Sequence, residues 1–85
     1  MNLTLRQLRY ISVVADNGSV AAAARTCRIA HSSILAALSQ AEIEMGVRLF
    51  DRRPSRGVGL TPAGERFVAS ARRLLAAEAE FERTM

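Results

Sequence analysis

Lysine is absent from this 85-residue sequence, and aromatic residues make up only 5% of it. Every positive side chain is therefore an arginine. The twelve arginines outnumber the eight acidic residues, which gives a net charge of +4 and a pI near 11.0. A small domain with this balance most often binds a polyanion. The scarcity of aromatic residues, beside fifteen alanines, favours short, closely packed helices over a large aromatic pocket.

Cysteine and long apolar runs are also scarce. The single cysteine, Cys27, excludes an internal disulfide, and with the one histidine, His31, it cannot complete a four-ligand zinc site. We expect Cys27 to be a small buried thiol. No apolar run approaches the ~20 residues of a membrane span, and the first residues lack the layout of a signal peptide. These absences predict a cytoplasmic protein with no metal site and no membrane role.

Catalytic chemistry finds no support in this sequence. One histidine, one cysteine and no carboxylate pair in a plausible cleft leave no acid–base couple. The segment 57–59, Gly-Val-Gly, is not a phosphate cradle, because it lacks a Walker lysine and a suitable following helix. We therefore expect no enzyme activity, no catalytic residue and no cofactor.

The first half of the chain predicts three helices. Thr4 and Gln7 have the spacing of a capping box, and Asn17-Gly18 would end the helix that they begin. Ser19 would cap a second helix that runs to Cys27. A third helix is predicted from about His31 to Met45, with a buried stripe made of Ile34, Leu38, Ala41 and Met45. Two helices joined by about three residues have helix-turn-helix geometry.

The second half predicts a hairpin and one long helix. Alternation around 47–50, turn chemistry at 51–57 and an apolar return at 58–60 indicate a short β-hairpin with a basic tip. Thr61-Pro62 would begin a helix of roughly 23 residues, or ~35 Å. We expect residues 1–60 to form the domain and 61–85 a linker or dimerisation helix.

The last helix carries an apolar stripe that continues past the predicted domain. Its members are Phe67, Val68, Ala71, Leu74, Leu75, Phe81 and Met85. Such a stripe needs a partner, which could be the same helix of a second copy in an antiparallel C2 dimer. The alternative, that the part from Phe67 to Leu75 covers the first helix of its own chain, stays open.

Several blocks of the sequence resemble one known family. They are Leu5-Arg6-Gln7-Leu8-Arg9-Tyr10, Gly18-Ser19, Ala23-Ala24, Met45-Gly46-Val47-Arg48-Leu49-Phe50 with Arg52, and Leu60-Thr61-Pro62-Ala63-Gly64-Glu65. Together they cover essentially the whole chain and are similar to the N-terminal region of LysR-type transcriptional regulators. The resemblance implies a mainly α-helical, winged helix-turn-helix DNA-binding domain with a short β-hairpin wing and a long C-terminal linker helix. It also implies that a small-molecule effector would act only through a larger domain absent from this chain, which would make the chain a fragment.

Two segments depart from the family pattern. The family usually carries Ser-Gln-Pro at 30–32, where this chain has Ala-His-Ser, and Ser-Arg at 35–36, where it has Leu-Ala. Without a serine at position 30, Ser32 could cap the third helix and start it two residues late. Without the arginine, the recognition helix, residues 31–45, has no cationic side chain.

The outward side of the recognition helix supplies the candidate base contacts. They are His31, Ser32, Ser33, Leu35, Ala36, Ser39 and Gln40. Gln40 could pair with an adenine or reach only a phosphate, whereas Leu35 and Ala36 can contact only a thymine methyl. We hypothesise methyl contacts and shape readout in place of an arginine–guanine code. The alternative that Leu35 packs in a small core stays open.

The wing supplies the candidate phosphate contacts. Arg52, Arg53 and Arg56 would touch the DNA backbone and an adjacent minor groove, with Arg28 a weaker phosphate candidate. A homodimer would place two recognition helices in successive major grooves of an interrupted inverted repeat. The alternative function is a helix-turn-helix-like protein-interaction module without DNA readout, which would have no use for three wing arginines.

Overall fold

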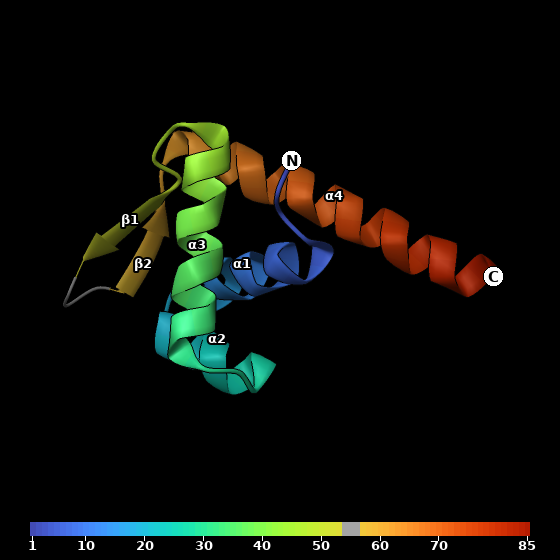
Figure 1. The fold of residues 1–85 in the computed structure, drawn as a ribbon, viewed down its shortest axis with the longest axis horizontal. Coiled ribbons are helices and arrows are strands. Elements are labelled where there is room, and N and C mark those ends of the chain that lie inside the picture. The colour runs from blue at the N-terminus through green and yellow to red at the C-terminus, as the bar shows by residue number, and fades with distance from the viewer. Residues whose placement is uncertain (54–56) are drawn as a thin grey trace.

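The computed structural model describes residues 1–53 and 57–85, and their elements follow the predicted order. These elements are α1 (Leu5–Asn17), α2 (Val20–Cys27), α3 (His31–Met45), β1 (Phe50–Arg53), β2 (Gly57–Leu60) and α4 (Pro62–Thr84) (Figure 1). The two strands pair antiparallel, with Phe50 opposite Leu60 and Arg53 opposite Gly57. The predicted fold class, mainly helical with a short hairpin, is confirmed.

Short-range hydrogen bonds set the ends of the first two helices. The Thr4 hydroxyl accepts the Gln7 N–H at 3.0 Å, and the Gln7 side chain accepts the Thr4 N–H at 3.0 Å. This is the predicted capping box. Gly18 ends α1 with a φ of 66°, a left-handed conformation that costs glycine little. Ser19 then caps α2 by accepting the Ala22 N–H at 3.2 Å.

Helix α3 begins at His31 although no side chain of the described residues caps it. The expectation that Ser32 caps a helix starting two residues late is wrong. The Ser33 N–H instead bonds to the carbonyl oxygen of Ala30 at 3.0 Å, so the first turn closes through the backbone alone. Ile34, one turn later, is fully buried and packs this part of α3 into the core.

The core lies around α1, which contacts the other three helices and β2. Its largest fully buried side chains are Ile11, Val14, Ile34, Leu38 and Leu49. Three alanines, Ala23, Ala37 and Ala41, are also fully buried. Because these alanines have no long side chain to hold the backbones apart, α2 and α3 approach closely at the helix-turn-helix. This is the arrangement that the sequence predicted.

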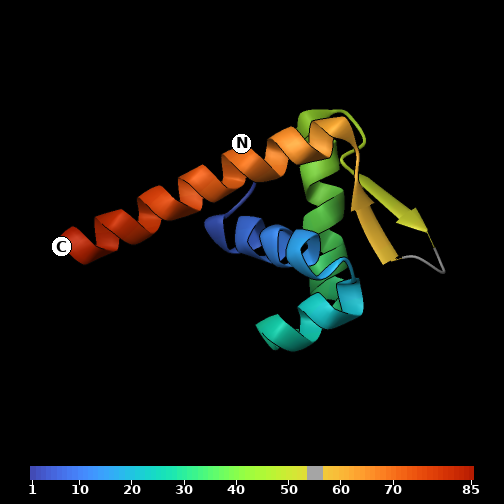
Figure 2. The same ribbon diagram turned by 180° about the vertical axis from the view of Figure 1, so that it is seen from behind.

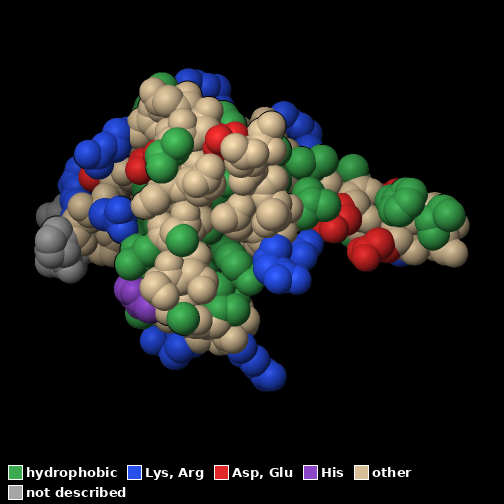
Figure 3. All heavy atoms as spheres, viewed as in Figure 1, with side chains coloured by type: hydrophobic (Ala, Val, Ile, Leu, Met, Phe, Trp, Pro, Cys, Tyr) green, Lys and Arg blue, Asp and Glu red, His purple; other side chains and the backbone are tan. Residues whose placement is uncertain are grey.

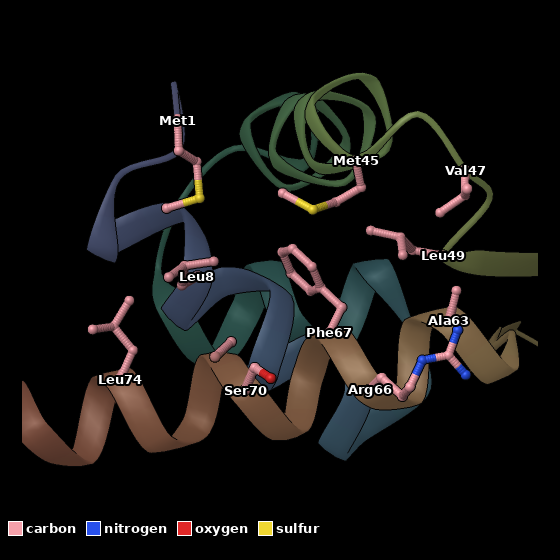
Figure 4. Close-up of a pocket in the computed structure, with 11 residues that line it drawn as sticks. Met1, Leu8, Met45, Val47, Leu49, Ala63, Arg66, Phe67, Ser70 and Leu74 are labelled. Atoms are coloured by element: carbon pink, nitrogen blue, oxygen red, sulfur yellow. The ribbon is translucent and has the colours of Figure 1, made fainter.

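Two residues expected to be buried, Met45 and Cys27, need correction, and one buried residue was not expected. Met45 is 41% exposed, and Ala37, absent from the predicted stripe, is buried in α3 instead. Ala37 lies one turn after the buried Ile34, whereas Met45 is the last residue of α3 and borders an open groove beside Phe67 (Figure 4). Cys27 is only partly buried, because it is the last residue of α2.

Helix α4 has the predicted 23 residues and two distinct halves. In its first half Val68 and Ala71 are each 4% exposed and pack into the core. Its second half extends away from the other helices (Figures 1 and 2). The core therefore crosses the predicted division at residue 60, and that division stays a prediction. None of the helices in the described residues combines the length and hydropathy needed to cross a membrane.

Candidate nucleic-acid interface

The outward face of α3 is mostly small and polar. Of the seven predicted contact residues, His31, Ser32, Ser33, Ala36 and Ser39 are exposed. Leu35 and Gln40 are half-buried. The opposite face holds Ile34, Leu38 and Ala41, which anchor the helix in the core. The helix therefore exposes three serine hydroxyl groups and one imidazole to solvent, while its opposite face is buried in the core.

Leu35 lies where α3 meets the wing, residues 50–60. It packs against the edge of the core and lines a shallow hollow together with His31, Arg52, Arg53 and Val58. The packing alternative is thus confirmed for part of the Leu35 side chain. The hollow also brings the first turn of α3 and the wing arginines to one surface. Figure 3 shows His31 on this side, with arginine side chains above and below it.

The end of α3 carries acidic residues beside the predicted contact Gln40. The side-chain amide of Gln40 donates to Oε2 of Glu44 at 3.5 Å, which is a long hydrogen bond. Glu44 also accepts the backbone N–H of Asn2 through Oε1 at 2.6 Å. Gln40 is therefore turned toward the carboxylate one turn later. It is the candidate contact farthest along α3.

The two described wing arginines are exposed but have different surroundings. Arg53 forms an ion pair with Asp51, at 3.1 Å from Nη2 to Oδ2. Arg52 lies opposite Val58 in the hairpin register. The third predicted wing arginine, Arg56, lies outside the described residues.

A backbone contact far apart in sequence holds the wing beside the helix-turn-helix. The Val58 N–H donates to the carbonyl oxygen of Gly18 at 2.9 Å. Gly57 has a φ of 78°, and a Cβ at that position would lie 2.1 Å from the same oxygen. A glycine is thus required where β2 meets the turn between α1 and α2. No local pattern in the sequence pointed to this contact.

Arg28 occupies the turn between α2 and α3 in an unusual conformation. Its φ of 57° is the one positive value among the described residues other than glycine. Its backbone N–H reaches the carbonyl oxygens of Ala24 and Arg25, so it closes α2 as a glycine usually does. The side chain is exposed in the turn before α3, as the sequence predicted.

Ion pairs join α1 to α4 on another part of the surface. Arg9 pairs with Glu78 at 2.8 Å, and Arg72 pairs with Asp16 at 2.5 Å. All four side chains are at least a quarter exposed, so each pair adds little to stability. They balance the charges of Arg9 on α1 and Arg72 on α4, away from the wing.

The structure divides the predicted dimerisation residues into three groups by their burial. Val68 and Ala71 belong to the core of their own chain, which corrects their assignment to a dimer contact. Phe67 and Leu75 are partly buried against that core. Leu74, Phe81 and Met85 are 44%, 63% and 88% exposed. The alternative that the first half of α4 covers its own domain is confirmed for the buried residues, and the exposed three remain open to a partner.

The helix pair α2–α3 over a core built on α1, followed by a two-stranded hairpin, defines a winged helix-turn-helix domain. Residues 5–65 match the family model described as bacterial regulatory helix-turn-helix protein, lysR family. The chain therefore belongs to the LysR family. This confirms the resemblance that its sequence blocks indicated.

Curated relatives of the chain are transcriptional regulators. TfdS of Cupriavidus pinatubonensis is 44% identical over 73 residues, which are 86% of this chain and 24% of the relative. ClcR of Pseudomonas putida is 45% identical over 73 residues, with the same shares of the two chains. The chain thus spans about a quarter of the length of these relatives.

Solved structures of similar fold include complexes with DNA. The DNA-binding domain of CbnR in a DNA complex is 36% identical with a TM-score of 0.86, over 96% of this chain and 94% of that one. The DNA-binding domain of BenM with benA site 1 DNA is 30% identical with a TM-score of 0.88, again over 96% and 94%. Full-length OxyR of Pseudomonas aeruginosa is 32% identical with a TM-score of 0.90, over 98% of this chain and 28% of that one.

Proposed function

We propose that this chain binds double-stranded DNA in a sequence-specific manner, as the DNA-binding part of a bacterial transcriptional regulator. The observation that carries the proposal is the single surface formed by the outward face of α3 and the wing arginines Arg52 and Arg53. The DNA complexes of the similar CbnR and BenM domains support it. A bacterial protein that binds double-stranded DNA in this way would act in the cytoplasm.

In this proposal α3 enters the major groove. Exposed Ser32 and Ser33 donate to phosphates or base edges, and Leu35 with Ala36 contacts thymine methyl groups. Arg52, Arg53 and Arg56 lie along the backbone and in the adjacent minor groove, and Arg28 reaches a phosphate. With no cationic side chain on α3, sequence is read through methyl groups and DNA shape.

We further propose a homodimer formed through the second half of α4. Leu74, Phe81 and Met85 are apolar and exposed on this helix, which supports a contact with a second copy. A twofold dimer would set two α3 helices about 34–36 Å apart, or a multiple of that, on an interrupted inverted repeat. A small-molecule effector would act through a domain outside this chain.

Fluorescence anisotropy on two duplexes tests the proposal. One duplex is an interrupted inverted repeat with T and A flanking each arm, the other is its scramble, and both are titrated across salt. A preference of about tenfold, worth ~1.4 kcal/mol, supports sequence reading by this chain alone. Equal affinities with a steep salt slope reduce the proposal to electrostatic attachment. No binding at low salt favours the protein-interaction module instead.

A further inference from the structure

The carboxylate of Glu42 joins the recognition helix to the wing. Its Oε2 accepts the backbone N–H of Leu49 at 2.9 Å and that of Phe50 at 3.1 Å. Glu42 is in the last turn of α3, and Phe50 is the first residue of β1. One carboxylate oxygen thus spans the two elements to which DNA contact is assigned.

This position is electrostatically unfavourable for an acid. The carbonyl groups at the C-terminal end of a helix carry a partial negative charge, which repels a carboxylate. The same helix is proposed to approach DNA phosphates, which also repel it. Glu42 is half-buried, and its described hydrogen bonds go to Phe50, the first residue of the wing, and to Leu49 just before it. The carboxylate thus makes two backbone hydrogen bonds at a position where its charge is disfavoured.

The segment that Glu42 holds is also fixed from its other side. The Thr61 N–H donates to the carbonyl oxygen of Leu49 at 3.0 Å, and the Thr61 hydroxyl donates to the carbonyl oxygen of Arg48 at 2.7 Å. The side chains of Leu49 and Phe50 are 2% and 3% exposed. The backbone leading into β1 is therefore clamped between α3 and the start of α4. The hairpin therefore leaves the core from a backbone segment that is hydrogen-bonded on both sides.

We infer that Glu42 is a positioning residue for DNA recognition: it orients the wing so that Arg52 and Arg53 meet the backbone while α3 is in the groove. Arg52 is only two residues beyond Phe50, so a tilt at this point moves its guanidinium. This inference rests on the proposed function. It requires no contact between Glu42 and DNA.

Two effects of a substitution at Glu42 on DNA affinity have opposite signs. Removal of the negative charge should tighten binding, whereas removal of the hydrogen-bond acceptor should weaken it. Glu42→Gln removes a negative charge but keeps an oxygen that can accept both N–H bonds, so DNA binding should stay equal or tighten. Glu42→Ala removes the same charge together with the acceptor. We expect it to bind about tenfold more weakly, with a salt slope shallower by about one for each phosphate that the wing no longer reaches. Tighter binding by Glu42→Ala would overturn the inference.

Glu44→Ala is the matched control, because it removes an acid from the same turn of α3 without touching β1. It should bind DNA at least as tightly as the unmodified chain. Glu42→Asp conserves the charge but shortens the side chain by one methylene. Its affinity should fall below that of the unmodified chain, and an unchanged affinity would contradict positioning. This second variant keeps the test decisive if Glu42→Ala does not fold.

A double-mutant cycle with Arg52→Ala links Glu42 to the wing. If Glu42 acts by placing Arg52, the loss of affinity from Arg52→Ala should be smaller in the Glu42→Ala background. Additive losses would argue that Glu42 acts elsewhere.

A measurement without DNA separates this inference from the proposed function. Residual dipolar couplings of β1 and β2 amides report the orientation of the wing relative to α3, and they should change in Glu42→Ala but not in Glu44→Ala. An unchanged wing orientation overturns the inference whatever the DNA result. If Glu42→Ala reorients the wing but the unmodified chain binds neither duplex, Glu42 still orients the wing and it is the proposed function that is refuted.

Discussion

The Cβ that Gly64 lacks would lie 1.9 Å from the carbonyl oxygen of Leu49 and 2.9 Å from its carbonyl carbon. The same oxygen accepts the Thr61 N–H, so the first turn of α4 rests directly on the backbone that leads into β1. Leu49 is itself buried in the core. Helix α4 and the segment that leads into the wing therefore share one contact, and neither can shift at that point without the other.

Gly64→Ala should destabilise the domain. An added methyl group would overlap backbone atoms, which cannot rotate away, and such overpacking costs about 1–3 kcal/mol. Denaturant unfolding followed by circular dichroism measures the change. Gly59→Ala is the matched control, because its Cβ would lie 3.8 Å from the nearest atom, the carbonyl oxygen of Asp51. Equal stabilities of the two variants would contradict the contact.

Ser12→Ala should stabilise the domain. In the described part of the chain the Ser12 hydroxyl is buried without a hydrogen-bond partner, a state that carries an uncompensated desolvation cost. Removing the hydroxyl should raise the free energy of unfolding by about 1 kcal/mol. Ser39→Ala, at an exposed position in α3, corrects for the higher helix propensity of alanine. If Ser12→Ala raises the free energy of unfolding no more than Ser39→Ala does, the Ser12 hydroxyl is solvated or hydrogen-bonded.

Arg28→Gly should change stability and DNA affinity in opposite directions. Glycine relieves the left-handed backbone, which costs other residues about 1 kcal/mol or more. The removal of the guanidinium should weaken DNA binding and reduce the salt slope by about one. Arg28→Ala keeps the backbone strain and removes the same charge, so it should show the weaker affinity without the gain in stability. Unchanged affinity in both variants would remove Arg28 from the interface.

Leu35→Ser should reduce the preference for half-sites that contain thymine. Replacing thymine by uracil removes only the methyl group, so the unmodified chain should bind roughly fivefold more weakly, a change of ~1 kcal/mol. In Leu35→Ser the difference in affinity between the two duplexes should be smaller, because only the proposed methyl contact of Ala36 is left. Because Leu35 also packs on the core, the fraction folded must be measured alongside. An unchanged preference for thymine in a folded Leu35→Ser chain would refute the methyl contact.

Phe81→Glu should weaken the dimer. Phe81 is 63% exposed on the second half of α4, where a charge would be buried by a second copy. Ala76→Glu is the control, because five residues of helix at 3.6 per turn place it on the opposite side. Sedimentation velocity should give a lower weight-average mass for Phe81→Glu alone. Equal masses for both variants would place the dimer contact elsewhere.

The sequence by itself determined where α1, α2 and α4 begin, because capping acts over three or four residues. It did not show how α3 begins, since no side chain of the described residues caps that helix. Thr4 with Gln7, Ser19 and Thr61 each make the cap hydrogen bond predicted from residue type and spacing. Gly46 ends α3 at the predicted residue. The family followed from ordered blocks of residues, and the exposure of five of the seven α3 candidates followed from helical periodicity.

Only the tertiary structure decided the relationships between distant segments. Val68 and Ala71 look like part of a continuous apolar stripe, and only the packing of α4 on α1 separates them from the exposed Phe81. The bond from Glu42 to the start of β1 depends on where the chain goes after α3. The contact of Val58 with Gly18 joins residues 40 positions apart. Such contacts form when whole elements pack, so residue type and local spacing carry no signal of them.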